Sequence, residues 1–160
     1  MTTNNPTGIN DTAALYRERI WPSVWVFITT ALVIPASLLV FLPINFFAGE
    51  IIAVVLYAAI VLVLVATSPV IEVTRLQLVA GRASVPIELV GTVTPYWGEE
   101  ATLQRGRLLD ARAWLLIRGW VSALVKVELN DANDPTPYWI LSTRTPDALV
   151  RAITNARTPA

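Results

Sequence analysis

The chain has 160 residues, of which 54% are hydrophobic and 15% are charged, a composition too apolar for an ordinary soluble domain and indicative of contact with lipid. Its twelve basic residues balance twelve acidic ones, and this zero net charge argues against a nucleic-acid partner. The sequence has no Cys and no His, which excludes disulfides, thiol nucleophiles, imidazole bases and the usual zinc ligands.

Two long uncharged runs follow the first 19 residues, which we assign to a cytoplasmic N-terminal segment. Glu50 is the only charged residue between residues 20 and 71. Each run that it separates is long enough for the about 20 helical residues that cross a bilayer core. We therefore predict a transmembrane helical hairpin over residues 20–69, with spans at about 24–42 and 51–69.

The residues that flank the hairpin predict its orientation. Basic residues precede the first span and follow the second at Arg75 and Arg82, whereas the connecting turn has none. By the positive-inside rule, both termini are then cytoplasmic and the protein lies in the plasma (inner) membrane. The expected membrane-interface anchors are Arg17, Arg19, Trp21 and Trp25.

The predicted spans favour a tether over an ion path. An intramembrane path normally needs buried ionisable groups, and no such group lies at mid-depth of either run. A cleavable signal peptide is also disfavoured, because a second long run follows the first. Pro35 is expected to kink the first helix.

Residues 70–160 have the pattern of a small cytoplasmic β domain, with short apolar segments separated by Gly, Pro and charged residues. We expect antiparallel strands and a mobile connection over residues 104–110, which is the most polar stretch. Thr145 as cap and Pro146 at the first helical position predict a C-terminal helix over about 146–156. The predicted strands are residues 71–73, 76–78, 83–85, 90–94, 113–117, 124–129 and 138–142.

The fold class is therefore an α+β membrane protein, in which a two-helix hairpin precedes a small antiparallel β domain closed by a helix. This order of elements resembles the bacterial pleckstrin-homology-like (PH-like) membrane proteins. The segment Leu76–Leu89, a strand, a Gly-Arg turn and Val85-Pro86-Ile87-Glu88-Leu89, is similar to the early hairpin of that domain. The resemblance implies a PH-like barrel or sandwich.

A second resemblance covers about residues 15–155. It rests on Tyr16-Arg17-Glu18-Arg19-Ile20-Trp21-Pro22, Asp110-Ala111-Arg112-Ala113, Arg118-Gly119-Trp120, Asp134-Pro135-Thr136-Pro137-Tyr138-Trp139 and Ser142-Thr143-Arg144. These segments resemble an uncharacterised actinobacterial family of small two-span membrane proteins, a catalogued domain of unknown function. The resemblance implies lineage and topology, and no activity.

Four arginines within residues 105–118 form the candidate contact site. Arg105, Arg107, Arg112 and Arg118 could touch lipid phosphates or a partner, with Trp120 as an exposed aromatic beside them. The alternative is that Asp110, Glu99 and Glu100 neutralise these arginines in surface ion pairs.

No catalytic, cofactor-binding or metal-ligating set emerges from the sequence. Glu99 and Glu100 lack an accompanying nucleophile, and the turn at Asp131 and Asp134 lacks the further ligands of a calcium loop. We therefore expect a non-enzymatic, membrane-anchored interaction or accessory module without cofactors. Its expected partners are the lipid bilayer and a membrane protein or further copies of the chain. The alternatives are anionic phospholipid-headgroup binding and, less favoured, an enzyme that uses carboxylates alone.

Overall fold

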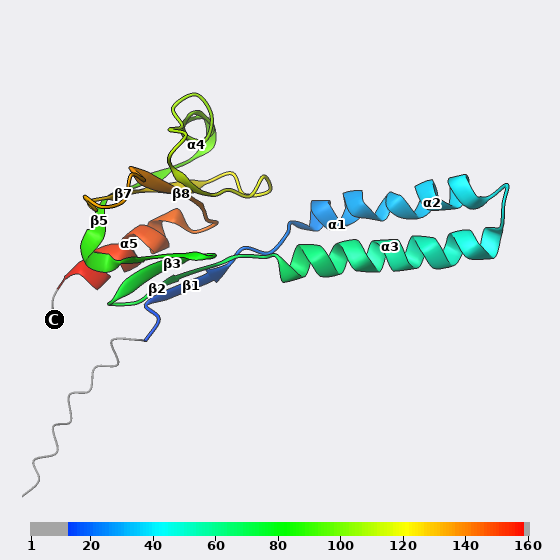
Figure 1. The fold of residues 1–160 in the computed structure, drawn as a ribbon, viewed down its shortest axis with the longest axis horizontal. Helices are drawn as coiled ribbons and strands as arrows, with labels where there is room; N and C mark the ends of the chain where they lie inside the picture. The colour runs from blue at the N-terminus through cyan, green and yellow to red at the C-terminus, as the bar shows by residue number, and fades with distance from the viewer. Residues whose placement is uncertain (1–12, 159–160) are drawn as a thin grey trace, which may run out of the picture. The chain divides into compact units, whose positions relative to one another are not determined.

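The computed structural model describes residues 13–158 and divides the chain into two compact units. The hairpin unit comprises residues 20–69, and the β unit comprises the segment up to Arg19 together with the chain from Val70 onward. Figure 1 shows the helices of the first unit and the sheets of the second. Each unit is described by itself.

The hairpin unit contains three helices, α1 (Val24–Ala31), α2 (Val33–Phe41) and α3 (Phe46–Ala66). The break between α1 and α2 lies at Leu32. Pro35 has no N–H to donate to the carbonyl of Ala31, and its ring crowds that carbonyl, so a disruption one turn before the proline follows. The disruption expected from Pro35 is therefore present as a break in the helix at Leu32.

Two helical stretches, Val24–Phe41 and Phe46–Ala66, are long and apolar enough to cross a membrane. Only 6% of the first stretch and 11% of the second are buried within the chain. A helix in the core of a soluble protein is mostly buried, so these helices are not core helices of the described fold.

The second helix begins and ends earlier than the predicted 51–69. Asn45 caps α3, because its side-chain oxygen accepts a hydrogen bond from the Ala48 N–H at 3.2 Å. Glu50 lies exposed inside the helix, so the charge that delimits the uncharged run does not delimit the helix. At the other end, Pro69 disfavours helical geometry at the residue before it.

Sheet A is an antiparallel meander in the order β1-β2-β3-β4. Its strands are β1 (Tyr16–Arg19), β2 (Val70–Val73), β3 (Gln77–Ala80) and β4 (Ala83–Pro86). Gly81 at the β3–β4 turn has a φ of 65°, a conformation that favours glycine. The last three strands lie where the sequence predicts them.

Strand β1 is absent from the prediction, which treats residues 1–19 as a segment outside the β domain. Its four residues pair with β2, with Arg19 opposite Val70. Only a partner more than 50 residues away makes this short polar segment a strand. The hairpin unit is thus inserted between two paired strands, and residues 20–23 and 67–69 join its helices to them.

Sheet B has the order β5-β7-β8-β6. Its strands are β5 (Val90–Tyr96), β6 (Trp114–Leu116), β7 (Leu124–Leu129) and β8 (Tyr138–Ser142). β6 pairs with β8 in parallel, so the expectation of antiparallel strands throughout is wrong for this pair. β7 pairs with both β5 and β8, so β6 adds at the outer edge of β8, where it runs in the same direction as β8.

The main core lies between the inner faces of the two sheets and α5 (Pro146–Arg157), the predicted C-terminal helix. Strand alternation places Val125 and Leu141 opposite each other on the inner face of sheet B. The residues of the β unit that are fully buried include Ile71, Val73, Leu78, Val125, Val127, Leu141, Leu149 and Ile153.

A second, smaller core lies on the outer face of sheet B. There Ala101 of α4 (Gly98–Gln104) packs against Leu124, Tyr138 and Ile140. Figure 1 shows α4 and α5 on opposite sides of sheet B. The sequence patterns predict no helix in this segment and so miss α4.

Candidate interaction surface

A long connection between two adjacent strands dominates the surface chemistry of the β unit. β5 and β7 are antiparallel neighbours, which a turn of two residues can join. The chain instead uses residues 97–123, which form α4, a series of turns and the edge strand β6. Binding residues lie disproportionately on surface connections that a rigid scaffold holds in place. We call residues 97–123 the β5–β7 connection.

Tyr138 fastens the middle of this connection to sheet B. Its hydroxyl accepts a hydrogen bond from the Asp110 N–H at 2.6 Å and donates one to the Leu108 carbonyl at 3.3 Å. The Lys126 ammonium lies 4.2 Å from the centre of the Tyr138 ring, in cation–π geometry. The sequence predicts a mobile stretch over residues 104–110. In the structure, a buried tyrosine holds this stretch in place.

Arg105 ties the end of α4 to the far end of the connection. Its guanidinium donates to the carbonyls of Val121 at 3.1 Å and Ser122 at 3.0 Å. Both bonds come from one planar group, so they orient the side chain as well as the loop. Arg105 thus links the end of α4 to the last residues of the β5–β7 connection.

Arg112 forms the predicted surface ion pair with Asp110. Its Nη2 lies 3.0 Å from Asp110 Oδ2, its Nε lies 3.2 Å from Oδ1, and its backbone N–H also donates to Oδ1 at 2.8 Å. These hydrogen bonds, more than the charge itself, lower the pKa of Asp110 to about 2 and raise the pKa of Arg112. The pair is local and solvated. This geometry agrees with the prediction of a surface ion pair and not with that of a phosphate site.

The remaining candidates divide between structure and surface. Arg118 is half-buried, donates to the Ile117 carbonyl at 3.1 Å and lies 6.0 Å from the centre of the Trp120 ring. The expectation of an exposed Trp120 is wrong, because its side chain is half-buried, with an Nε1 that is inaccessible and has no hydrogen-bond partner among the described residues. Arg107 is exposed and forms no ion pair within residues 13–158.

The connection gathers most of the exposed large apolar side chains of the β unit. In the described part of that unit, the only others are Leu15 and Leu76. Sequence reasoning singles out the arginines and Trp120 and overlooks this apolar set, although the density of Trp and Leu between two turns is a readable signal. Its members are Trp97, Leu103, Leu108, Trp114 and Leu115.

The four expected membrane anchors fall in both units. Arg17 and Arg19 lie on the exposed face of β1, where Arg17 pairs with Glu72 at 3.6 Å. Trp21 and Trp25, at the start of the hairpin unit, are 45% and 73% exposed.

A hydrogen-bonded cluster joins β1 to the segment before α5. Glu18 Oε2 accepts from the Thr143 hydroxyl at 2.5 Å and from the Tyr16 hydroxyl at 2.7 Å, while Oε1 accepts from the Arg144 N–H at 3.0 Å. Burial, and then the bond to Glu18, raise the pKa of Tyr16. Thr145 stands at the N-cap position but makes no side-chain cap bond, and its hydroxyl lies 2.8 Å from that of Tyr16. This geometry corrects the predicted role of Thr145.

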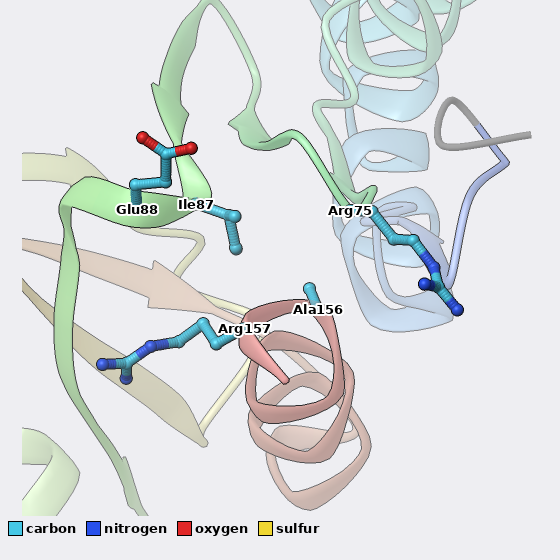
Figure 2. Close-up of a pocket in the computed structure, with 5 residues that line it drawn as sticks. All are labelled: Arg75, Ile87, Glu88, Ala156 and Arg157. Atoms are coloured by element: carbon cyan, nitrogen blue, oxygen red, sulfur yellow. The ribbon is translucent and has the colours of Figure 1, made fainter. Parts of the chain in front are cut away.

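One hollow of the β unit is lined by charged side chains that do not converge on a common point (Figure 2). This hollow, of about 420 Å³, lies between α5 and the 3₁₀ turn η1 (Ile87–Leu89). Figure 2 shows the charged ends of Arg75, Glu88 and Arg157 pointing in different directions. The Arg157 guanidinium is already engaged, because it donates to the Gly91 carbonyl at 2.8 Å. Among residues 13–158, no group of three or more acidic side chains is placed to hold a metal ion.

Comparison with known proteins identifies a family without assigning an activity. No curated protein and no solved structure matches the chain. The expected actinobacterial lineage stays a prediction. A family model does match residues 15–153, and this match includes both the hairpin unit and the β5–β7 connection. The chain therefore belongs to the family described as protein of unknown function (DUF3093).

Proposed function

We propose that this protein is a non-enzymatic, membrane-anchored interaction module that docks a membrane-protein partner through its β5–β7 connection. The observation that carries the proposal is the concentration of exposed Trp and Leu side chains on a long connection between two strands that a short turn could join. Trp and Arg are enriched at the centres of protein interfaces, and exposed apolar side chains gathered in one segment mark interaction sites.

The hairpin unit is the proposed anchor. Two helical stretches of sufficient length and apolarity support this role. The hydrogen bonds of their threonine hydroxyls support it too. Thr29 and Thr30 donate to carbonyls of their own helix at 2.8 and 2.7 Å, and Thr67 does the same at 2.7 Å. Polar groups satisfied within the helix are what an apolar solvent requires.

The proposed orientation places both termini and the β unit on the cytoplasmic side of the plasma membrane. It rests on the arginines that flank the hairpin and on their absence from the turn. Because only residues 20–23 and 67–69 separate the helices of the hairpin unit from β1 and β2, the chain keeps the β unit within a few residues' reach of the proposed spans.

We further propose that the β unit is a PH-like domain with an insertion. Two sheets packed with a closing C-terminal helix support this assignment. On this view, the β5–β7 connection is the insertion, added between two strands that a short turn could join.

Binding of anionic headgroups is the second candidate, and three of its four arginines argue against it. Arg105 donates to two carbonyls, Arg112 is paired with Asp110, and Arg118 lies against Trp120. Each would have to give up a contact to bind phosphate. Arg107 remains the side chain best placed for a headgroup.

The test is quantitative capture of the tagged full-length protein from its own membranes in mild detergent. Leu108→Glu alters the connection, and Leu76→Glu is the matched control, because the two leucines are 59% and 57% exposed. Wild type and the control should recover one stoichiometric membrane protein. Leu108→Glu should reduce its recovery by about tenfold, the loss of a typical interface anchor.

Two results contradict the proposal. One is recovery of the wild-type protein alone, and the other is equal loss of the partner in both variants. Liposome binding by the full-length protein that needs anionic lipid and disappears in Arg107→Ala favours the headgroup alternative instead.

A further inference from the structure

The edge strand β6 differs from every other edge of the two sheets. Exposed sheet edges invite pairing by another chain, and proteins protect them with charges, prolines or bulges. β1 carries Arg17, Glu18 and Arg19, and β4 ends in Pro86. β5 contains Pro95 and a bulge between Val90 and Val93.

β6 carries no charge, proline or bulge, and its length of three residues is its one protection. Its sequence is Trp114-Leu115-Leu116, and β8 is its only strand neighbour in the described part of the chain. Trp114 is 38% exposed and Leu115 is 43% exposed, although strand alternation directs them to opposite faces. The ladder with β8 uses one side of the β6 backbone and leaves the other side open.

We infer that β6 receives an extended segment of another protein, apolar at its centre and acidic at its flanks, as an added strand of sheet B. This inference rests on the proposed function and names the kind of partner that the β5–β7 connection docks. Backbone hydrogen bonds to the open edge supply affinity, and contacts with Trp114 and Leu115 supply selectivity.

The charges around β6 favour an added segment whose flanks are acidic. Residues 105–118 carry four arginines and a single acidic residue, Asp110. Arg118 follows the strand, and Arg112 before it is paired with Asp110, so the excess positive charge beside an added strand comes from Arg105, Arg107 and Arg118. Complementary charge at the ends steers encounter and fixes the register of pairing.

A second copy of this chain fits the edge less well. Two-fold symmetric pairing of β6 with its copy is antiparallel, and when centred on Leu115 it sets Arg112 opposite Arg118 of the copy. Like charges opposite each other on paired strands are unfavourable. A bilayer fits less well too, because acyl chains cannot satisfy the open N–H and C=O groups of a strand edge.

Site-specific photocrosslinking tests the inference on the full-length protein in its own membrane. Benzoylphenylalanine replaces Leu115 in one variant, Trp114 in a second and Leu76 in a control. Positions 114 and 115 should crosslink to neighbouring residues of one segment of a different protein. Mass spectrometry of the adduct should find apolar residues with Asp or Glu within a few positions on either side, and position 76 should give no such adduct.

Partner recovery gives a second readout. Leu115→Glu should lower recovery by about tenfold, because it places a carboxylate against an apolar, acid-flanked strand. Leu115→Ile keeps the apolar surface and favours a strand, so recovery should stay within about twofold of wild type. The side chain is partly exposed, so neither change removes a buried residue.

The outcomes separate this inference from the proposed function. A partner that is lost in Leu108→Glu, kept in Leu115→Glu and never crosslinked from position 115 overturns the strand addition and leaves the interaction module standing. An adduct with the same chain shows a second copy at the edge, and an adduct with lipid alone shows a bilayer surface, so either overturns the inference. Absence of any partner from wild-type membranes overturns both proposals.

Discussion

Asp110 and Arg112 show how a single pair can be tested by titration. Because the hydrogen bonds from Arg112 hold the pKa of Asp110 at about 2, replacing that side chain should raise it toward the ordinary value of 3.8. Carbon-13 NMR titration of the Asp110 carboxyl in wild type and Arg112→Gln measures this change. The same titration value in both proteins would contradict the pairing.

The sign of the pH effect follows from the lowered pKa. A carboxylate whose pKa is lower in the folded protein stabilises the fold above its unfolded pKa of about 4. That contribution is lost as the pH falls through about 2. The pair therefore stabilises the connection at neutral pH and does not act as a switch there.

Tyr138 predicts a larger effect on stability. Tyr138→Phe keeps the packing of the ring but removes the group that bonds the Asp110 N–H and the Leu108 carbonyl. Leaving these groups without a partner should cost about 1–3 kcal/mol of unfolding free energy. Thermal unfolding of the full-length protein in detergent measures the cost, and faster hydrogen exchange confined to residues 105–110 should accompany it. Unchanged exchange there would show that the hydroxyl does not fasten the connection.

At the scale of elements, the Glu18 cluster joins the first strand to the start of the last helix. Glu18→Gln replaces an acceptor-only carboxylate with an amide whose NH₂ must face donors, and should cost about 1–3 kcal/mol. Glu72→Gln is the control, because Glu72 takes part in an exposed ion pair worth at most about 1 kcal/mol. Equal loss of thermal stability in the two variants would show that the cluster does not join these elements.

The elements also show what sequence patterns can predict. β7, β8 and α5 lie where alternation and turn chemistry place them, because their side chains meet one dominant core. β1 and α4 escape prediction because their partners are distant in sequence. The Tyr16–Arg19 strand needs β2, and Ala101 needs Tyr138 and Ile140 of β8 to give α4 a buried side.

The candidate site is predicted only in part. The sequence places four arginines and Trp120 in one segment, and the pairing of Arg112 with Asp110 is the alternative that sequence reasoning itself raises. The two carbonyls that hold Arg105 lie in a later turn, which local spacing does not reveal. The open edge at β6 depends on strand order, a property of the whole sheet.

For the whole molecule, the proposed topology can be tested by labelling, because the chain has no cysteine. Ile44→Cys places a thiol in the exposed turn before α3, and Ser84→Cys places one on exposed β4. A membrane-impermeant maleimide should label position 44 in intact cells, and position 84 only after permeabilisation. Labelling of position 84 in intact cells would reverse the orientation.

The central claim is that the β5–β7 connection is the surface by which this anchored module holds its partner. Hydrogen exchange of the full-length protein, alone and in the purified complex, tests the claim directly. Partner binding should slow exchange within residues 97–123 and leave the region around Ile87 and Ala156 unchanged. Protection centred on that region, with the connection unaffected, would contradict the account.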